Sequence, residues 1–151
     1  MTAPHFVHLR LHSEFSIVDG TVRIDDGIAA AVADAMPALA VTDLANAFGL
    51  VKFYRAARAR GVKPIIGCDV WLTHEAERDQ PFRALLLAQS RAGYLRLSAW
   101  LTRAYRGNQH RGRAELKRDW FAEGTDGLIA LSGAREGEVG TALLQGNASG
   151  A

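Results

Sequence analysis

The chain has 151 residues, of which 48% are hydrophobic and 23% charged, a composition typical of one folded domain and unlike that of a disordered protein. A net charge of +2 is too small to indicate a nucleic-acid binder by itself, and a lone cysteine, Cys68, excludes an internal disulfide framework. Histidines and an arginine near the N-terminus exclude a secretion signal, and Asp34 and Pro37 interrupt the most apolar stretch. We therefore expect a cytoplasmic protein that does not contact a membrane.

The first half of the chain alternates strand and helix patterns. Apolar runs ending in polar turns predict strands, and apolar residues at helical spacing predict helices. Asp25 and Asp26 favour a helix start, because the helix dipole stabilises anions there. In chain order, the expected elements are a strand at 6–11, a loop at 13–21, a helix at 25–35, a buried strand at 38–42 and a helix at 48–60.

The second half continues this alternation, with Asp69 near the end of one strand. Its expected elements are strands at 62–73, 82–88 and 127–131, helices at 92–105 and 138–144, and a basic polar loop at 107–115. Strands alternating with helices predict parallel βαβ units, in a barrel or an open sheet. The small polar residues at 145–151 lead us to expect that residues 1–151 form an incomplete domain.

The stretch from His8 to His12 contains the most informative side chains. On a strand, His8, Arg10 and His12 lie on one face, so two imidazoles flank a guanidinium. Imidazole is the commonest metal ligand, but the arginine between the two rings disfavours a cation. His12 is therefore either a metal ligand or a hydrogen-bonded histidine at a strand end. The other four histidines, His5, His8, His74 and His110, have weaker claims.

Basic residues concentrate in two segments, 52–63 and 103–118. They form either solvated surfaces or, in the second segment, a contact with the DNA backbone. The candidate DNA contacts are Arg103, Arg106, Arg111, Arg113, Lys117 and Arg118.

Several well-known catalytic motifs are absent from the sequence. There is no Gly-x-Ser-x-Gly elbow, no phosphate-binding Gly-x-x-x-x-Gly-Lys loop and no Gly-x-Gly-x-x-Gly fingerprint. Cys68 has no histidine base nearby in a readable motif, so we interpret it as a small core residue.

Longer strings of sequence identify a family resemblance. The strings are FVHLRLHSEFS through Asp19-Gly20, PALAVTD at 37–43, GLVKFY through GVKPIIG at 49–67, and GLIALSG at 127–133. Together they resemble the N-terminal PHP (polymerase and histidinol phosphatase) domain of bacterial DNA polymerase III alpha subunits. The resemblance implies a distorted (β/α)7 barrel, here incomplete with about five strands.

The resemblance also implies positions for a metal cluster. In metal-binding members a His-x-His pair falls on Arg10 and His12, an Asp-His pair on Asp43 and Leu44, and a glutamate on Asp69. Two imidazole positions are thus replaced, by Arg10 and Leu44. His12, Asp43 and Asp69 remain as possible metal ligands, and we expect no catalytic residue in this segment.

The function implied by the resemblance is support of a replicative DNA-directed DNA polymerase, a nucleotidyltransferase whose catalytic aspartates lie far downstream. The segment would brace the polymerase and dock the proofreading exonuclease subunit of the DNA polymerase III holoenzyme, while DNA and Mg would bind the full-length protein. No cofactor is expected in the segment itself. The alternative is an active metal-dependent phosphoesterase that binds Mn or Zn through His12, Asp43 and Asp69.

Electrostatics favour the supporting role over the metal-dependent phosphoesterase. A guanidinium about 5 Å from a dication costs roughly 7 kcal/mol at an effective dielectric constant near 20. We therefore hypothesise that Arg10 replaces the positive charge of the metal and pairs with Asp43 or Asp69.

Overall fold

A computed structural model describes residues 6–147 of the chain. The chain divides into two compact units, Met1–Cys68 and Asp69–Ala151. No helix within the described residues is long and apolar enough to cross a membrane.

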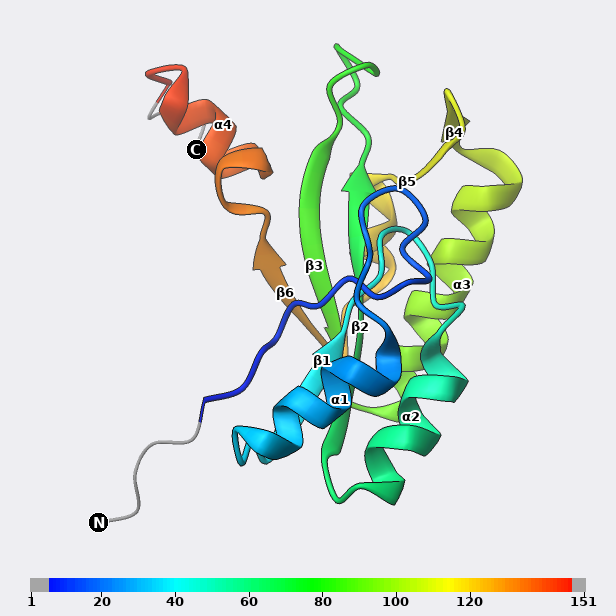
Figure 1. The fold of residues 1–151 in the computed structure, drawn as a ribbon. Coiled ribbons are helices and arrows are strands. Elements are labelled where there is room, and N and C mark those ends of the chain that lie inside the picture. The colour runs from blue at the N-terminus through cyan, green and yellow to red at the C-terminus, as the bar shows by residue number, and fades with distance from the viewer. Residues whose placement is uncertain (1–5, 148–151) are drawn as a thin grey trace. The chain divides into compact units, whose positions relative to one another are not determined.

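The first unit contains two helices and two paired strands. Helix α1 (Ile24–Ala33) precedes the fully buried strand β1 (Ala38–Val41), and helix α2 (Leu50–Ala59) leads to strand β2 (Lys63–Leu72), of which residues 63–68 belong to this unit and residues 69–72 to the second. Residues 38–41 pair in parallel with residues 63–66, and α1 and α2 pack against each other and against β1 (Figure 1). Their inward side chains form one apolar core, made of Ile24, Ile28, Ala31, Leu39, Val41, Phe53, Ala57 and Val62.

The expected first strand at 6–11 is wrong, since this segment contains no strand residue. The segment lies beside β1. Two backbone hydrogen bonds hold it there, in which the amides of Ala40 and Thr42 donate to the carbonyls of His8 and Leu11. The amide of Leu11 donates to the Thr42 hydroxyl, at 2.9 Å, and not to a backbone carbonyl. A side chain thus replaces one step of the hydrogen-bond ladder, which leaves the segment extended but outside the sheet.

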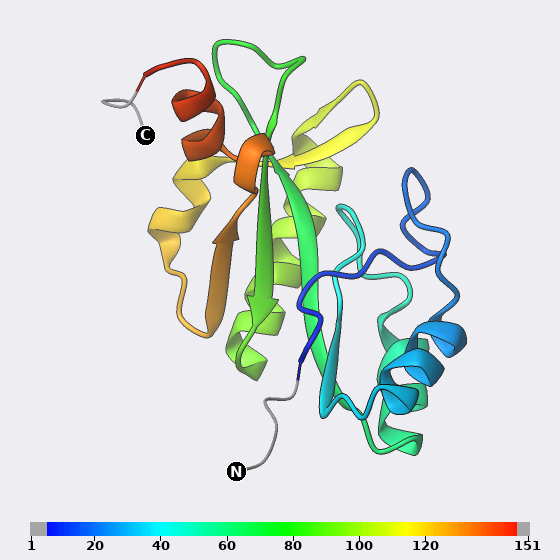
Figure 2. The ribbon, with the colours of Figure 1, turned by 60° about the vertical axis from the view of Figure 1, so that its left-hand side comes forward.

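The second unit contains an open sheet with strand order β4-β5-β2-β3-β6 (Figure 2). Helix α3 packs on β3 and β5, and it begins after Ser90, whose hydroxyl accepts from the amide of Gly93 as an N-cap. The elements are β3 (Phe82–Ala88), α3 (Arg91–Gly107), β4 (Gln109–His110), β5 (Arg113–Leu116), the 3-10 helix η1 (Arg118–Glu123), β6 (Leu128–Ser132), the 3-10 helix η2 (Ala134–Glu136) and α4 (Glu138–Leu144).

Two features of this unit differ from the sequence expectations. The basic loop expected at 107–115 contains the hairpin of β4 and β5, which turns at Arg111 and Gly112 with φ values of 49° and 79°. Two consecutive positive φ angles suit a tight hairpin turn, although arginine is an unusual residue there. Strand β6 also pairs antiparallel with β3, so the sheet is mixed and the parallel pattern is only partly correct. The described residues thus form six strands, one more than expected, in a sheet that does not close.

Candidate functional site

Asp43 is the second residue after the end of β1 and is 2% exposed. Ser13 holds both of its carboxylate oxygens. The backbone amide donates to Oδ1 at 2.6 Å, and the hydroxyl donates to Oδ2 at 2.9 Å. Burial raises the pKa of Asp43, while the two Ser13 hydrogen bonds and the nearby His12 act in the opposite direction. Asp43, a possible metal ligand, is therefore a buried carboxylate whose two oxygens each accept a hydrogen bond from Ser13.

His12 lies beside a second acid in the same unit, Asp19. Its Nδ1 is 2.9 Å from Asp19 Oδ2, and the Ser16 hydroxyl donates to the other oxygen of Asp19 at 2.6 Å. The Ser16 hydroxyl also accepts from the amide of Leu44 at 3.0 Å, which ties the loop to the residues after β1. A side chain at Gly20 would meet the Ser13 carbonyl at 1.9 Å, so only glycine fits there. The sequence placed Asp19 in the predicted loop at 13–21 but did not identify it as a partner of His12.

Leu44 and Cys68 line the interior of the same unit. Leu44, where metal-binding relatives would have an imidazole, is 8% exposed and apolar. Cys68 is completely buried, and its thiol donates to the carbonyls of Asp43 and Asn46 at 3.2 and 3.4 Å. The structure thus places Cys68 in the core, as the sequence indicated.

Asp69 begins the second unit and forms a buried ion pair that the sequence analysis missed. Arg83 Nε donates to Oδ1 at 3.1 Å and Nη2 donates to Oδ2 at 2.8 Å, so the contact is bidentate. The two side chains are 2% and 7% exposed, and the guanidinium also lies 4.3 Å from the centre of the Trp71 ring. Bidentate arginine–carboxylate pairs are among the strongest charge-assisted hydrogen bonds, and here the pair holds a positive charge against Asp69.

The surroundings of Asp69 do not suit a metal ion, whereas the hydrogen bonds of Asp43 leave lone pairs on its oxygens. Both oxygens of Asp43 accept from Ser13, and both oxygens of Asp69 accept from a guanidinium. A metal ion at Asp69 would have to displace Arg83 or lie beside its charge, which is costly at short range. Arg10 is exposed in the structure, and its pairing with Asp43 or Asp69 stays a prediction.

A further buried acid, Glu115 on β5, is fully enclosed in the second unit. Its carboxylate lies 3.1 Å from Arg78 and 3.4 Å from Arg113, and the Thr73 hydroxyl donates to it at 3.2 Å. The Asn108 amide links the Thr73 hydroxyl to the Glu115 carbonyl. Buried charges need such partners, so these residues stabilise the fold.

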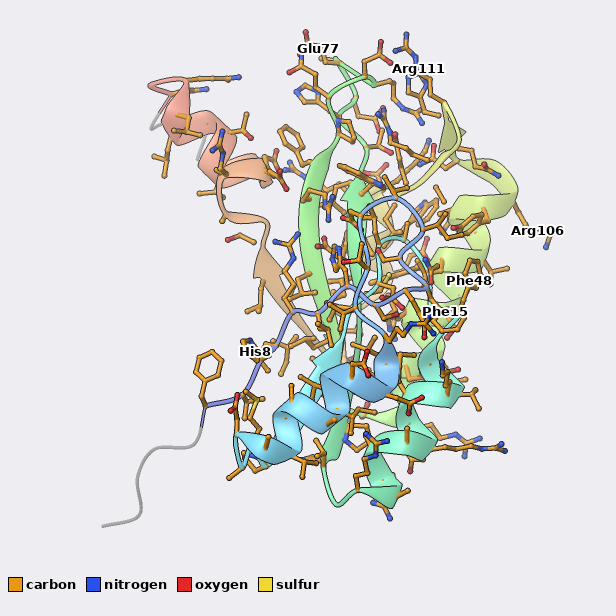
Figure 3. All side chains as sticks on the ribbon, in the orientation of Figure 1. His8, Phe15, Phe48, Glu77, Arg106 and Arg111 are labelled. Atoms are coloured by element: carbon orange, nitrogen blue, oxygen red, sulfur yellow. The ribbon has the colours of Figure 1, made fainter. Side chains whose placement is uncertain are left out.

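Most of the candidate DNA contacts have acidic partners. The pairs are Arg103 with Glu123 at 2.6 Å, Arg111 with Asp79 at 2.9 Å, Arg113 with Glu115, and Arg118 with Glu138. Arg103 also stacks on the Trp120 ring, 4.3 Å from its centre. Arg106 and Lys117 have no carboxylate partner among the described residues, and Figure 3 shows Arg106 extending away from α3. The basic segment therefore carries less uncompensated charge than its sequence suggests.

Comparison with known proteins places this architecture in a family. The family model of the PHP domain matches residues 8–151. The chain is 53% identical over 151 residues to the DNA polymerase III subunit alpha of Neisseria meningitidis serogroup A, and 48% identical over 141 residues to that of Pseudomonas aeruginosa. These alignments cover 97% and 93% of this chain, but only 13% and 12% of the relatives.

A solved structure has a similar fold. It is an amidohydrolase from Chromobacterium violaceum with bound sulfate and no metal, which matches with a TM-score of 0.52 and 27% identity. The match covers 67% of this chain and 34% of the amidohydrolase. The family model, which extends over nearly all of the sequence, shows that the chain belongs to the PHP domain family.

Proposed function

We propose that the chain is the N-terminal PHP segment of a replicative DNA polymerase of the polymerase III alpha type, acting in the cytoplasm. In this role the segment supports the polymerase and does not hydrolyse phosphoesters. Its similarity to two curated alpha subunits over more than nine-tenths of its length supports the parent protein. The bidentate Arg83–Asp69 pair is the observation that carries the non-catalytic role.

The physical reason is a competition for one carboxylate. A metal-dependent phosphoesterase uses its acids to hold cations that clamp the reacting oxygens and acidify water. Arg83 supplies a fixed positive charge to Asp69 within the protein, so that both oxygens of this carboxylate have a cationic partner without a metal. Such an acid contributes to stability and is not available for catalysis.

Partners follow from the proposed parent. DNA and the Mg of nucleotidyl transfer would bind elsewhere in the longer polymerase, and the proofreading exonuclease subunit would dock on this segment. The test uses the full-length protein, in primer extension and in size-exclusion chromatography with the exonuclease subunit. We expect extension of a primed template and co-elution of the two proteins. A full-length protein that extends no primer would refute the proposal that the parent protein is a DNA polymerase. Separate elution of the two proteins would refute the docking of the exonuclease subunit.

One observation favours the rival function, a metal-dependent phosphoesterase. His12 Nδ1 faces the carboxylate of Asp19 at 2.9 Å, and histidines that bind metals usually donate their second nitrogen to such an acid. In this function His12, Asp43 and Asp69 would hold Mn or Zn. Metal content and hydrolysis of a phosphoester by the purified protein separate the two functions.

A further inference from the structure

Helix α2 presents an exposed face that combines apolar and basic side chains. Val51, Tyr54, Arg55 and Arg58 are spaced three, four and seven residues apart, which places them on one side of the helix. We call these four residues, with Phe48 just before the helix, the α2 outer face. Phe53 and Ala57, on the opposite side, are buried in the core, so the two sides of α2 have separate roles.

The apolar part of the α2 outer face is open to solvent. Phe48, Val51 and Tyr54 are 62%, 59% and 47% exposed. Phe48 lies just before the first turn of α2 (Figure 3), and the ring of Phe15 would contact a side chain placed at the next residue, Gly49. Isolated exposed apolar residues are ordinary, but adjacent ones beside charged residues mark interaction surfaces.

The basic part of the face consists of Arg55 and Arg58. Lys52 donates to Glu14 at 2.8 Å, and Arg60 lies 3.8 Å from Asp25, so these two cations of the α2 region are paired within the unit. Within the described part of the chain, neither Arg55 nor Arg58 has a carboxylate partner, and α2 itself contains no acid. The two guanidiniums, one helical turn apart, are therefore available to carboxylates from outside.

We propose that the α2 outer face docks an acidic amphipathic helix of a partner protein. Charge complementarity favours this occupant, because carboxylates one turn apart on such a helix would match Arg55 and Arg58. The composition favours a protein over a nucleic acid. Aromatic residues and arginine are enriched in protein interfaces, and the aliphatic Val51 between Phe48 and Tyr54 adds an apolar contact that suits the apolar side of a helix. The α2 outer face would bind such a helix whatever the catalytic activity of the full-length protein.

The test uses a fluorescent helix-forming peptide of about 18 residues, long enough to form a helix, with leucines at helical spacing and glutamates beside them. A second peptide carries glutamine in place of each glutamate, and oligo(dT) serves as the nucleic-acid probe. Fluorescence anisotropy measures binding of each probe to the 151-residue chain and to its variants. We expect the acidic peptide to bind at least about tenfold more tightly than the glutamine peptide.

Variants locate the binding. The double change Arg55→Glu with Arg58→Glu should weaken acidic-peptide binding at least about tenfold, and Val51→Asp should weaken both peptides. The matched control, Arg91→Glu with Arg106→Glu, reverses two exposed charges on α3 and should leave binding unchanged. Circular dichroism checks that each variant is folded. Absent peptide binding, equal binding by the Arg55/Arg58 variant, or oligo(dT) binding that depends on Arg55 and Arg58 would each overturn the proposal.

Discussion

Replacing Arg83 by methionine should strongly destabilise the second unit. The change removes two hydrogen bonds to a carboxylate that is 2% exposed, at 2.8 and 3.1 Å, and leaves that charge without its guanidinium. Removing one partner of a buried ion pair typically costs about 3–5 kcal/mol, because the other charge stays desolvated. Loss of the contact with the Trp71 ring adds about 0.5–1 kcal/mol.

A second change tests the cause of this loss. Adding Asp69→Asn to Arg83→Met replaces the buried charge by a neutral amide, so the double variant should be more stable than Arg83→Met alone by about 2 kcal/mol or more. Urea unfolding followed by circular dichroism measures the free energy of unfolding of Arg83→Met, Asp69→Asn and the double variant. If Arg83→Met costs less than about 1 kcal/mol, or if the two single effects simply add, Asp69 does not depend on the charge of Arg83.

Three further predictions concern other residues. Burial raises the pKa of Asp43, so the folded protein binds its proton more tightly than the unfolded chain and loses stability as pH rises from about 4 through the raised pKa. Asp43→Asn should flatten that fall in a series of urea titrations, and an unchanged slope would contradict the assignment. Strand β6 pairs only with β3 among the described residues, so its other edge is open to pairing with a second chain, and Leu131 on it is 38% exposed. Leu131→Lys should therefore reduce self-association measured by light scattering. The control change Leu143→Lys, on α4, should not reduce it. Arg10→Met should lower stability at neutral pH by up to about 1 kcal/mol, and unchanged stability would remove Arg10 as a replacement for metal charge.

The helices and most strands could be predicted from the sequence because their apolar spacing is local. Residues 82–88 were predicted with the bounds that the structure shows, and α2 differs from the predicted helix by two residues at its start and one at its end. The hairpin of β4 and β5 was missed, since its strands have two and four residues and are rich in polar side chains. The segment before Ser13 has a strand pattern, but the Thr42 hydroxyl takes the place of a backbone acceptor. The hydrogen bond from Leu11 to Thr42 joins residues far apart in the sequence, and no local pattern encodes it.

The site was only partly predictable. The resemblance identified His12, Asp43 and Asp69 as positions of interest, but not the residues that hold them. Arg83 is 14 residues from Asp69 and on another strand, so no spacing rule connects the two. One signal was present: alternation along β3 places Arg83 on the same side as Leu85 and Leu87, and both leucines are buried. A charged residue on the buried side of a strand indicates a buried partner.

The most direct test of the account is the response of the purified protein to Mn²⁺ and Zn²⁺. Metal content is measured after dialysis against each ion, together with hydrolysis of a phosphoester by the same sample. The account predicts less than one tightly bound ion per chain and no metal-dependent turnover, because Arg83 occupies the carboxylate of Asp69. Stoichiometric metal, with turnover that His12→Ala abolishes, would contradict it and establish a phosphoesterase.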